Sequence, residues 1–256
     1  MSVEHRSQGP SCDAGGKRRK SFRPSSWSPV IVGIAVALAI GLDALPVLAK
    51  DSTVVVPAPL LDEQRQDATS ETAVLAGGCF WGVQAVFQHV NGVSRAVSGY
   101  AGGSKEDAVY EVVSSGHTGH AESVEVTFDP RVVSYGTILQ IFFSVVHNPT
   151  ELNRQGPDVG PQYRSAIFAQ DATQRRIAEA YIDQLDKAGV YRKRIVTQVN
   201  GASPFYPAEP YHQDYATLHP DSPYIAMFDL PKIDALQHIF HAYARAKPVL
   251  LGAASR

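Results

Sequence analysis

The stretch GGCFWG at residues 77–82 places a nucleophile inside a tight turn. Cys79 lies between paired glycines and two aromatic residues, a short apolar strand precedes it, and apolar residues at helical spacing follow it. Cys79 therefore falls at a helix N-terminus, where unpaired amides and the helix dipole favour an anion. We expect a reactive thiolate there. A lone cysteine buried as a small apolar residue is the alternative.

A second cluster of chemically capable residues is GHTGHAE, which carries His117, His120 and Glu122. Two histidines next to a carboxylate allow a zinc site, but their spacing around glycines is typical of a turn rather than of a metal-binding helix. The histidines can instead fasten the loop by hydrogen bonds. Glu122 can act as a general acid if its surroundings keep it protonated near neutral pH.

A third cluster lies in the long, mostly non-periodic stretch from His147 to Phe168. Irregular connections of this length in compact domains are often binding elements. This one brings Asp158, Tyr163 and Arg164 together.

These motifs occur in a familiar order: GCFWG at 78–82, GYAGG at 99–103, GHTGHAESVEVTFDP at 116–130 and NRQGPDVGPQYRSAIF at 153–168. With all four in place, the chain from about Thr72 to Leu230 resembles the peptide methionine sulfoxide reductase A family, in its bacterial type with a single catalytic cysteine.

The resemblance implies that Cys79 attacks the sulfur of an oxidised methionine and that Glu122 protonates the departing oxygen. Sulfoxide sulfur is a poor electrophile until its oxygen accepts a proton, so this pairing of thiolate and acid fits the chemistry. The product on the enzyme is a sulfenic acid. The family also implies the S epimer at sulfur, in free methionine or in accessible peptides and oxidised proteins.

Five further site residues are implied by the same resemblance. They are Tyr110 and Tyr163 as donors to the sulfoxide oxygen, Asp158 as a residue that positions the site, and Phe80 and Trp81 as the apolar wall that receives the substrate's methyl group.

Recycling of the sulfenic acid is where the sequence departs from many family members, because no cysteine follows Cys79. We expect no bound cofactor and no metal, and an external thiol reductant, either a thioredoxin-like protein or a small thiol. Two other departures, Asn148 where the family commonly has aspartate and Pro157 where it usually has asparagine, concern the hydrogen bonds around the site.

Two other classes of protein are compatible with parts of the pattern. A cysteine hydrolase or acyltransferase would pair Cys79 with His147 or His212 as its base, and it would leave Glu122 without a task. A non-catalytic binder of oxidised proteins would keep the aromatic residues and need neither Cys79 nor Glu122.

The elements that must position these residues alternate along the chain. Strands are expected at 72–78, 93–103, 121–130, 163–170 and 194–200, and helices at 79–90, 134–147, 172–187 and 232–246. This predicts an α/β (α+β) fold, a two-layer sandwich of a mixed sheet covered by helices, with a ferredoxin-like core. Strand order cannot be read from the pattern.

The N-terminus has the layout of a secretory signal. A basic cluster at 17–23 precedes an apolar run at 30–42, and Val47 and Ala49 are small residues before a cut after residue 49. An uncleaved anchor is the alternative. We expect an exported protein that is periplasmic or anchored in the inner membrane facing the periplasm.

The chain thus divides into four parts: a signal or anchor at 1–49, a linker at 50–71, the catalytic domain at 72–230, and a C-terminal helix and tail at 231–256. A formal net charge of −2 gives no reason to expect nucleic acid as a partner. We expect a monomer.

Overall fold

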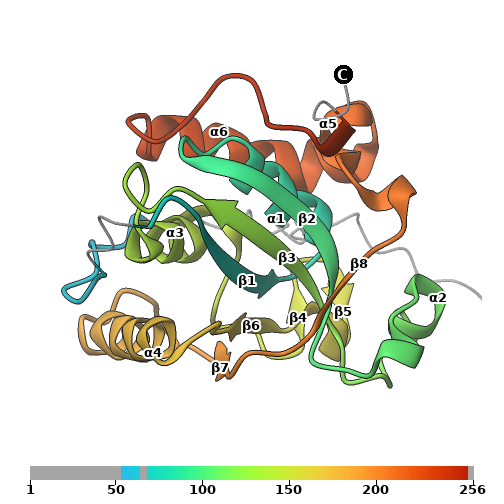
Figure 1. Ribbon diagram of the computed structural model, residues 1–256, viewed down its shortest axis with the longest axis horizontal. Coiled ribbons are helices and arrows are strands. Elements are labelled where there is room, and N and C mark those ends of the chain that lie inside the picture. The colour runs from blue at the N-terminus through green and yellow to red at the C-terminus, as the bar shows by residue number, and fades with distance from the viewer. Residues whose placement is uncertain (1–52, 64–67, 253–256) are drawn as a thin grey trace, which may run out of the picture. The chain divides into compact units, whose positions relative to one another are not determined.

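The computed structural model describes residues 53–63 and 68–252, so the expected signal or anchor at 1–49 lies outside the described residues. Figure 1 shows the arrangement of the elements. The strands are β1 (Glu71–Gly77), β2 (Val93–Ala101), β3 (Ala121–Phe128), β4 (Arg154–Gln155), β5 (Asp158–Val159), β6 (Ser165–Phe168), β7 (Gln198–Asn200) and β8 (Phe205–Pro207). The α-helices are α1 (Phe80–Gln88), α2 (Tyr110–Val113), α3 (Tyr135–Ile141), α4 (Ala172–Lys187), α5 (Tyr215–Leu218) and α6 (Leu230–Ile239). None of the helices in this part of the chain is long and apolar enough to cross a bilayer.

Within the described residues, six strands form one mixed sheet in the order β7-β6-β1-β3-β2-β8. Neighbours run antiparallel except β6 and β7, which are parallel. The four central strands, β6-β1-β3-β2, follow the order of a β-α-β-β-α-β unit in which α1 and α3 are the crossing helices. The predicted mixed sheet with helices is therefore confirmed.

Helices cover one face of this sheet. The main core joins Phe87 of α1, Leu139 of α3 and Tyr181 of α4 to apolar side chains of the central strands. A much smaller cluster on the other face is built largely from alanines and is covered in part by Phe205. Because most of the large apolar side chains gather on one face, two layers are sufficient to form the core.

Local sequence explains where the helices begin. Ser134 caps α3 by accepting a hydrogen bond from the amide of Thr137, and Asp171 caps α4 by accepting one from Gln174. The expected helix at 134–147 is α3 followed by a π-helical turn, Phe142–Val146. The C-terminal helix ends at Ile239, seven residues earlier than its apolar pattern suggests.

One short stretch supplies both edges of the sheet. Asn200 ends β7 at one edge, and Phe205 begins β8 at the other. Five Cα steps span at most about 19 Å, whereas the five spacings between six strands amount to about 24 Å in a flat sheet. The sheet must therefore curl so that its two edges approach each other.

Residues 53–63, which we assigned to a linker, pack along α3 and α4. The hydroxyl of Tyr181 donates to the carbonyl of Pro57 at 2.6 Å. Asp62 accepts hydrogen bonds from Ser134 Oγ at 2.5 Å and from the Gly136 amide at 2.9 Å. This stretch is thus attached to the domain at the first turn of α3.

Candidate active site

The turn that carries Cys79 connects β1 to α1 through two glycines. Gly78 has φ +94°, and a Cβ on it would lie 2.6 Å from the side chain of Gln155. Gln155 is fixed there because its side chain accepts from the amide of Asn148 and donates to the carbonyl of the same residue. The expected tight turn is therefore present, with Cys79 as the N-cap of α1.

Glu122 lies directly beside this turn. It comes from β3, next to β2 in the sheet, and its side chain is 2% exposed. Its Oε2 accepts a hydrogen bond of 3.0 Å from the amide of Phe80, the first residue of α1. Burial raises the pKa of Glu122 to about 8, although the hydrogen bond from Phe80 acts in the opposite direction. The carboxyl is therefore protonated near neutral pH, as a general acid must be.

Cys79 differs from what the sequence led us to expect. Burial, followed by the charges of Glu122 and Asp229, raises the pKa of Cys79 well above its usual range, and only the Trp81 amide lowers it. Cys79 is nevertheless partly exposed, and the direction of the shift favours a thiol over the expected thiolate in the free protein. The N-terminal pole of α1 does attract negative charge, but two carboxyl groups share that pole with the sulfur.

Tyr110 and Tyr163 reach the same site from two separate segments. Tyr110 begins α2, and Tyr163 ends a 3₁₀ turn, Pro161–Tyr163, just before β6. Burial and then the charge of Glu122 raise the pKa of both tyrosines, and Cys79 contributes in both cases. Both hydroxyls therefore remain protonated donors, and they lie close enough to Glu122 and Cys79 to share one site.

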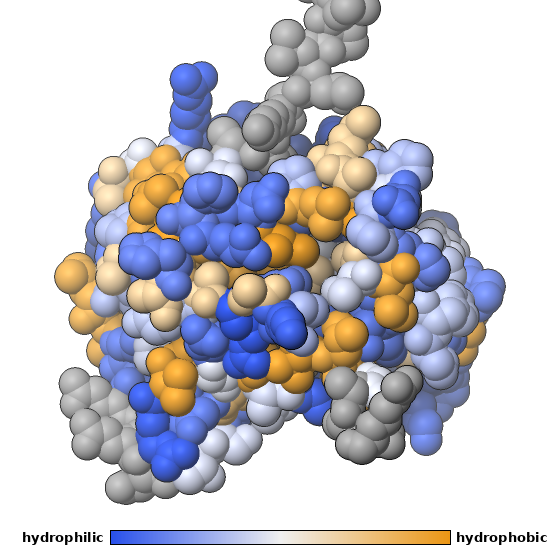
Figure 2. Space-filling model, turned by 90° about the horizontal axis from the view of Figure 1, so that it is seen from above, coloured by the Kyte–Doolittle hydropathy of each residue, from blue (hydrophilic) through white to orange (hydrophobic). Residues whose placement is uncertain are grey.

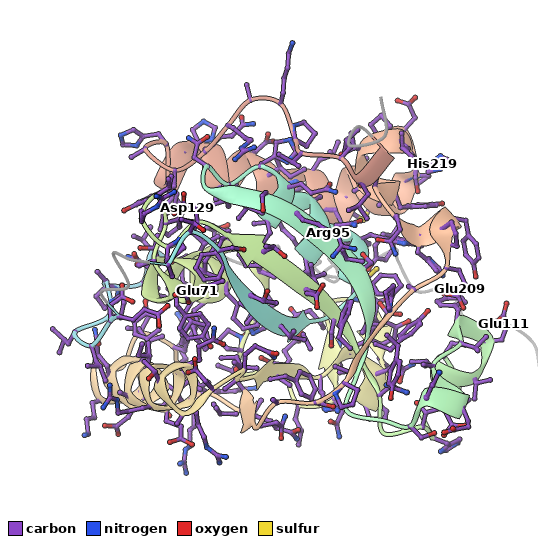
Figure 3. All side chains as sticks on the ribbon, viewed as in Figure 1. Glu71, Arg95, Glu111, Asp129, Glu209 and His219 are labelled. Atoms are coloured by element: carbon purple, nitrogen blue, oxygen red, sulfur yellow. The ribbon has the colours of Figure 1, made fainter. Side chains whose placement is uncertain are left out.

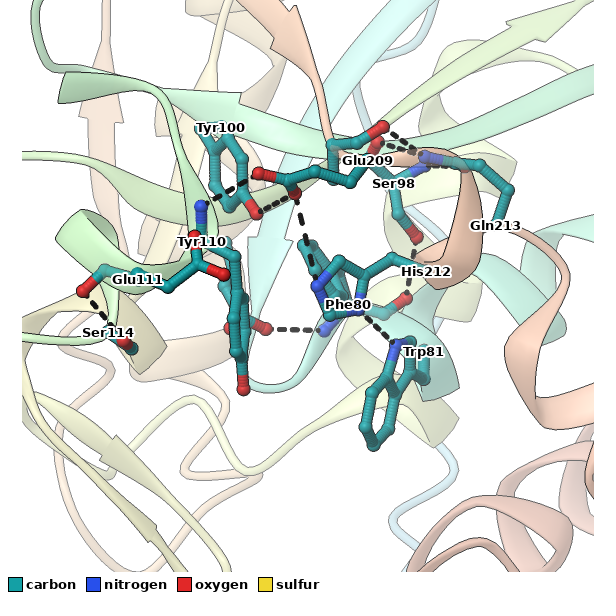
Figure 4. Close-up of polar contacts among 12 residues, drawn as sticks. Phe80, Trp81, Ser98, Tyr100, Tyr110, Glu111, Ser114, Glu209, His212 and Gln213 are labelled. Atoms are coloured by element: carbon teal, nitrogen blue, oxygen red, sulfur yellow. Dashed lines mark hydrogen bonds and ion pairs between the residues drawn. The ribbon is translucent and has the colours of Figure 1, made fainter.

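Glu209 fixes the position of Tyr110, a role that the sequence gave no sign of. Its Oε1 accepts from the Tyr110 amide at 2.9 Å and its Oε2 accepts from the Tyr100 hydroxyl at 2.9 Å, as Figure 4 shows. Figure 3 places Glu209 beside α2, while Glu71 and Asp129 lie at the opposite end of the sheet. The first residue of α2 is therefore held by a residue almost a hundred positions later in the chain.

Asp158 is held by Tyr224, which also went unrecognised in the sequence. The Tyr224 hydroxyl donates to Asp158 Oδ2 at 2.5 Å. Burial raises the pKa of Asp158, while this hydrogen bond lowers it. Tyr224 also meets Trp81 edge to face, with ring centroids 6.0 Å apart. Asp158 is thus joined to the aromatic residues of the site through Tyr224.

The two aromatic residues after Cys79 have different surroundings. Phe80 is 1% exposed and packs against Tyr100 and His212, so its ring offers a ligand almost no surface. Trp81 is partly exposed and stacks on Tyr215 with ring centroids 4.0 Å apart. Its Nε1 donates to His212 Nδ1 at 3.1 Å. Trp81 is therefore the better placed of the two to contact a substrate.

The histidines of the second cluster do not act together as ligands. His120 is buried, its Nδ1 accepts from the Gly103 amide at 3.2 Å, and its Nε2 is 2.7 Å from the Ser104 carbonyl. His117 is exposed. Both ring nitrogens of His120 are thus used to fasten the GYAGG loop, and the described residues include no group of three side chains suited to a metal ion.

The histidines considered for a hydrolase are also engaged elsewhere. His147 is 3.2 Å from the Phe142 carbonyl through Nδ1 and 2.7 Å from Ser165 Oγ through Nε2. Burial lowers the pKa of His147 to about 3. His212 uses Nδ1 to accept from Trp81. Among the described residues, neither histidine is hydrogen-bonded to Cys79, whereas Glu122 accepts a hydrogen bond from the amide that follows it.

The two departures from the family pattern have little effect on these contacts. Asn148 Oδ1 accepts hydrogen bonds from the amide and the hydroxyl of Thr150, at 3.1 and 2.8 Å, which a neutral side chain does as well as a carboxylate. Pro157 lies at the tip of the β4–β5 hairpin, directly before Asp158. Asp158 still reaches Tyr224 from there.

A protein-family model described as peptide methionine sulfoxide reductase matches residues 71–243. This match extends beyond residue 230, where we expected the catalytic domain to end, and includes α6. A relative from Mesorhizobium japonicum named peptide methionine sulfoxide reductase MsrA 2 is 63% identical over 186 residues, which cover 73% of this chain and 95% of the relative.

Two solved structures resemble this fold. Mxr1 from Saccharomyces cerevisiae in its reduced form has a TM-score of 0.53 at 31% identity, over 61% of this chain and 89% of that one. Methionine sulfoxide reductase A of Corynebacterium diphtheriae has a TM-score of 0.51 at 32% identity, over 67% of this chain and 90% of that one.

Proposed function

The chain belongs to the peptide methionine sulfoxide reductase family and is an oxidoreductase that reduces methionine sulfoxide, and on that premise we propose that Cys79 and Glu122 carry the reaction. One observation supports this above the others. A buried carboxyl group with a pKa of about 8 is hydrogen-bonded to the amide that follows Cys79, so an acid and a nucleophile meet at one helix terminus.

In the proposed step, Cys79 Sγ attacks the sulfoxide sulfur while Glu122 gives its proton to the sulfoxide oxygen. The oxygen passes to Cys79, which becomes a sulfenic acid, and methionine leaves. The thiol proton of Cys79 replaces the one that Glu122 has given away. Cys79 is oxidised by two electrons and the sulfoxide is reduced by two, so the step balances without a cofactor.

The raised pKa of Cys79 favours a thiol in the free enzyme, so the sulfur must lose its proton during the attack. A polar S–O group next to Glu122 takes up the proton of the acid in the transition state, and the carboxylate that remains can receive the thiol proton. The hydrogen bond between Glu122 and the sulfoxide oxygen is strongest in the transition state, when negative charge develops on that oxygen. Stabilisation of the transition state more than of the bound substrate accelerates the reaction.

The remaining residues would bind and orient the sulfoxide. Tyr110 and Tyr163 would donate to its oxygen, because their raised pKa values keep both hydroxyls protonated. Trp81 would contact the substrate's methyl group, and the buried ring of Phe80 would support the site without contacting the substrate. Asp158 would orient the site through Tyr224.

We propose that the S epimer is the substrate, in free methionine sulfoxide and in oxidised proteins, and that an external thiol regenerates Cys79. A thiolate of a thioredoxin-like protein or a small thiol would attack the sulfenic sulfur and release water, and a second thiol would reduce the mixed disulfide. The signal-like pattern before residue 50 makes the periplasm the proposed place of action.

Single-turnover reduction without added thiol tests the proposal. The wild-type protein should form one methionine per chain from the S epimer and lose the Cys79 thiol, detected as a dimedone adduct on the peptide that contains Cys79. Cys79→Ser should fold but form none. Methionine production by the folded Cys79→Ser variant would rule out the proposed nucleophile.

A further inference from the structure

A second buried carboxyl group, Asp229, lies beside the catalytic turn in addition to Glu122. It ends a π-helical turn, Ile225–Asp229, directly before α6, and its side chain is 0% exposed. Its Oδ1 accepts from Lys232 Nζ at 3.2 Å, and among the described residues its Oδ2 has no hydrogen-bond partner. A buried carboxylate with an unsatisfied oxygen costs stability.

The pair of Asp229 and Lys232 contacts the first turn of α1 directly. A Cβ at Gly82 would lie 2.1 Å from Asp229 Oδ1 and 2.9 Å from Lys232 Nζ. Gly82 is the third residue of α1, counted from Phe80. A side chain at the second glycine of the GCFWG motif would therefore have to displace the carboxylate and the ammonium group that occupy this space.

Several elements bring charged or titratable groups to Cys79. Asp229, Asp158 on β5 and, once it is ionised above about pH 8, Glu122 on β3 each raise the pKa of Cys79. Tyr110, Tyr163 and Tyr224 lie near enough to the same sulfur for the charge of Cys79 to raise the pKa of each. Lys232 Nζ donates to Asp229, and its charge lowers the pKa of both Asp229 and Asp158.

We propose that Asp229 and Lys232 act as a positioning pair for Cys79. The carboxylate holds α1 at Gly82, and the ammonium group balances the carboxylate, so that α6 helps to set the charge around the sulfur. The pair touches neither substrate nor reacting atoms in this scheme. The inference rests on the proposed role of Cys79 as the nucleophile.

Alkylation of Cys79 by iodoacetamide tests the pair, because the rate follows the thiolate fraction. The full chain is used at pH 8, and modification is followed by mass spectrometry on the peptide that contains Cys79, so that Cys12 does not contribute. Asp229→Asn removes a like charge and should raise the rate at least about threefold, whereas Lys232→Met leaves that charge unbalanced and should lower it by a similar factor. Lys232→Arg should behave like wild type.

The exposed pair of Asp183 and Lys187 on α4 supplies matched controls, because Asp183→Asn and Lys187→Met change the net charge equally, far from the sulfur. These variants should leave the alkylation rate unchanged. The proposal would be overturned if the control variants changed the alkylation rate of Cys79 by an equal factor. It would also be overturned if Asp229→Asn and Lys232→Met changed this rate in the same direction.

If Asp229 and Lys232 served only to pack α6 against α1, the two substitutions would not change the alkylation rate of Cys79 in opposite directions. If Asp229→Asn fails to fold, as judged by circular dichroism, the double variant Asp229→Asn/Lys232→Met replaces it and must react faster than Lys232→Met. The measurement does not depend on turnover. Failure of the pair therefore leaves the role of Cys79 intact, and failure of the nucleophile would appear only in the single-turnover experiment.

Discussion

At the scale of single residues, the main feature is that Glu122 and Cys79 share the N-terminal pole of α1. Glu122 accepts the Phe80 amide, and the Trp81 amide lowers the pKa of Cys79. Because the carboxyl group is buried, it is held neutral, which leaves the proton available for a substrate oxygen. The resting pair is thus a thiol and a carboxylic acid.

Replacing Glu122 by Gln should keep the hydrogen bond from Phe80 and remove the transferable proton. We expect kcat to fall by about 10² or more with a small change in KM, since the proton is needed mainly in the transition state. In the wild type, kcat/KM should fall as the pH rises through about 8, where Glu122 loses its proton. Steady-state assays with methionine S-sulfoxide from pH 6 to 10 measure both effects.

Equal activity of Glu122→Gln and wild type across that range would mean that another group supplies the proton. Glu111 is a suitable control, because it is an exposed carboxyl group on α2 beside Tyr110, and Glu111→Gln should retain the wild-type profile.

The residue types of the site could be predicted from the sequence, but their protonation could not. Cys79, Glu122, Tyr110, Tyr163 and Asp158 do come together, as their motifs suggested. The charges that raise the pKa of Cys79 include Asp229, which lies 150 positions away and is brought in by α6. Burial is the largest cause of that shift, and neither the burial of Cys79 nor the approach of Asp229 can be recognised from the residues around Cys79 in the sequence.

At the scale of elements, long periodic segments could be predicted and short ones could not. The spacing of apolar residues and the capping residues predict strands β1 and β3 and helices α1 and α4. Helix α2 and strand β8, with four and three residues, carry too little periodicity. Helix α2 depends on the distant contact between Glu209 and Tyr110 and carries a site residue, and strand β8 directly precedes the segment that contains Glu209.

The turn between β1 and α1 allows a test of whether a distant contact, the one between Gly78 and Gln155, determines the local structure. In Gly78→Ala, the new Cβ would meet both a strained φ of +94° and the Gln155 side chain at 2.6 Å. Gly189→Ala is the control, because Gly189 has φ +61° with open space around it. We expect a loss of about 1 kcal/mol in the free energy of unfolding for Gly189→Ala from backbone strain, and a loss at least about 1 kcal/mol larger for Gly78→Ala.

Urea denaturation measures both values, and single-turnover assays should show that only Gly78→Ala reduces activity. If the two alanine variants lost the same stability, the contact with Gln155 would not be what requires glycine at position 78.

At the scale of the whole molecule, two buried groups give stability opposite pH dependences. The pKa of Glu122 rises from 4.5 to about 8 on folding, so the folded protein binds the extra proton and stability falls as pH rises across that window. The pKa of His147 falls from 6.5 to about 3, so stability falls as pH drops across that window. Each changes the free energy of unfolding by about 1.4 kcal/mol per pH unit.

The two effects cancel between about pH 4.5 and 6.5, and we expect maximal stability there. Glu122→Gln should abolish much of the loss above pH 6.5 while keeping the loss below pH 4.5. Thermal unfolding from pH 3.5 to 8.5 checks this. A variant that loses stability above pH 6.5 as steeply as the wild type would show that Glu122 is ionised in the folded protein.

The outer surface adds little to these effects. Figure 2 shows the side of the molecule above the sheet, where hydrophobic residues are interspersed among hydrophilic ones. Among the described ion pairs, Arg175–Glu179 and Lys187–Asp183 are exposed i,i+4 pairs, which contribute little to stability. The strong electrostatic contributions come from the interior.

The stretch 198–207, which supplies β7 and β8, also shields the sheet from other molecules. Only three residues at each edge pair with this stretch, and both edge strands are too short to serve as good templates for strand addition. If the stretch detached, the nine-residue strand β2 would become an open edge with unpaired amides and carbonyls. Resistance to aggregation at both ends of the sheet thus depends on one ten-residue segment, and chain breakage or local unfolding there would expose both edges together.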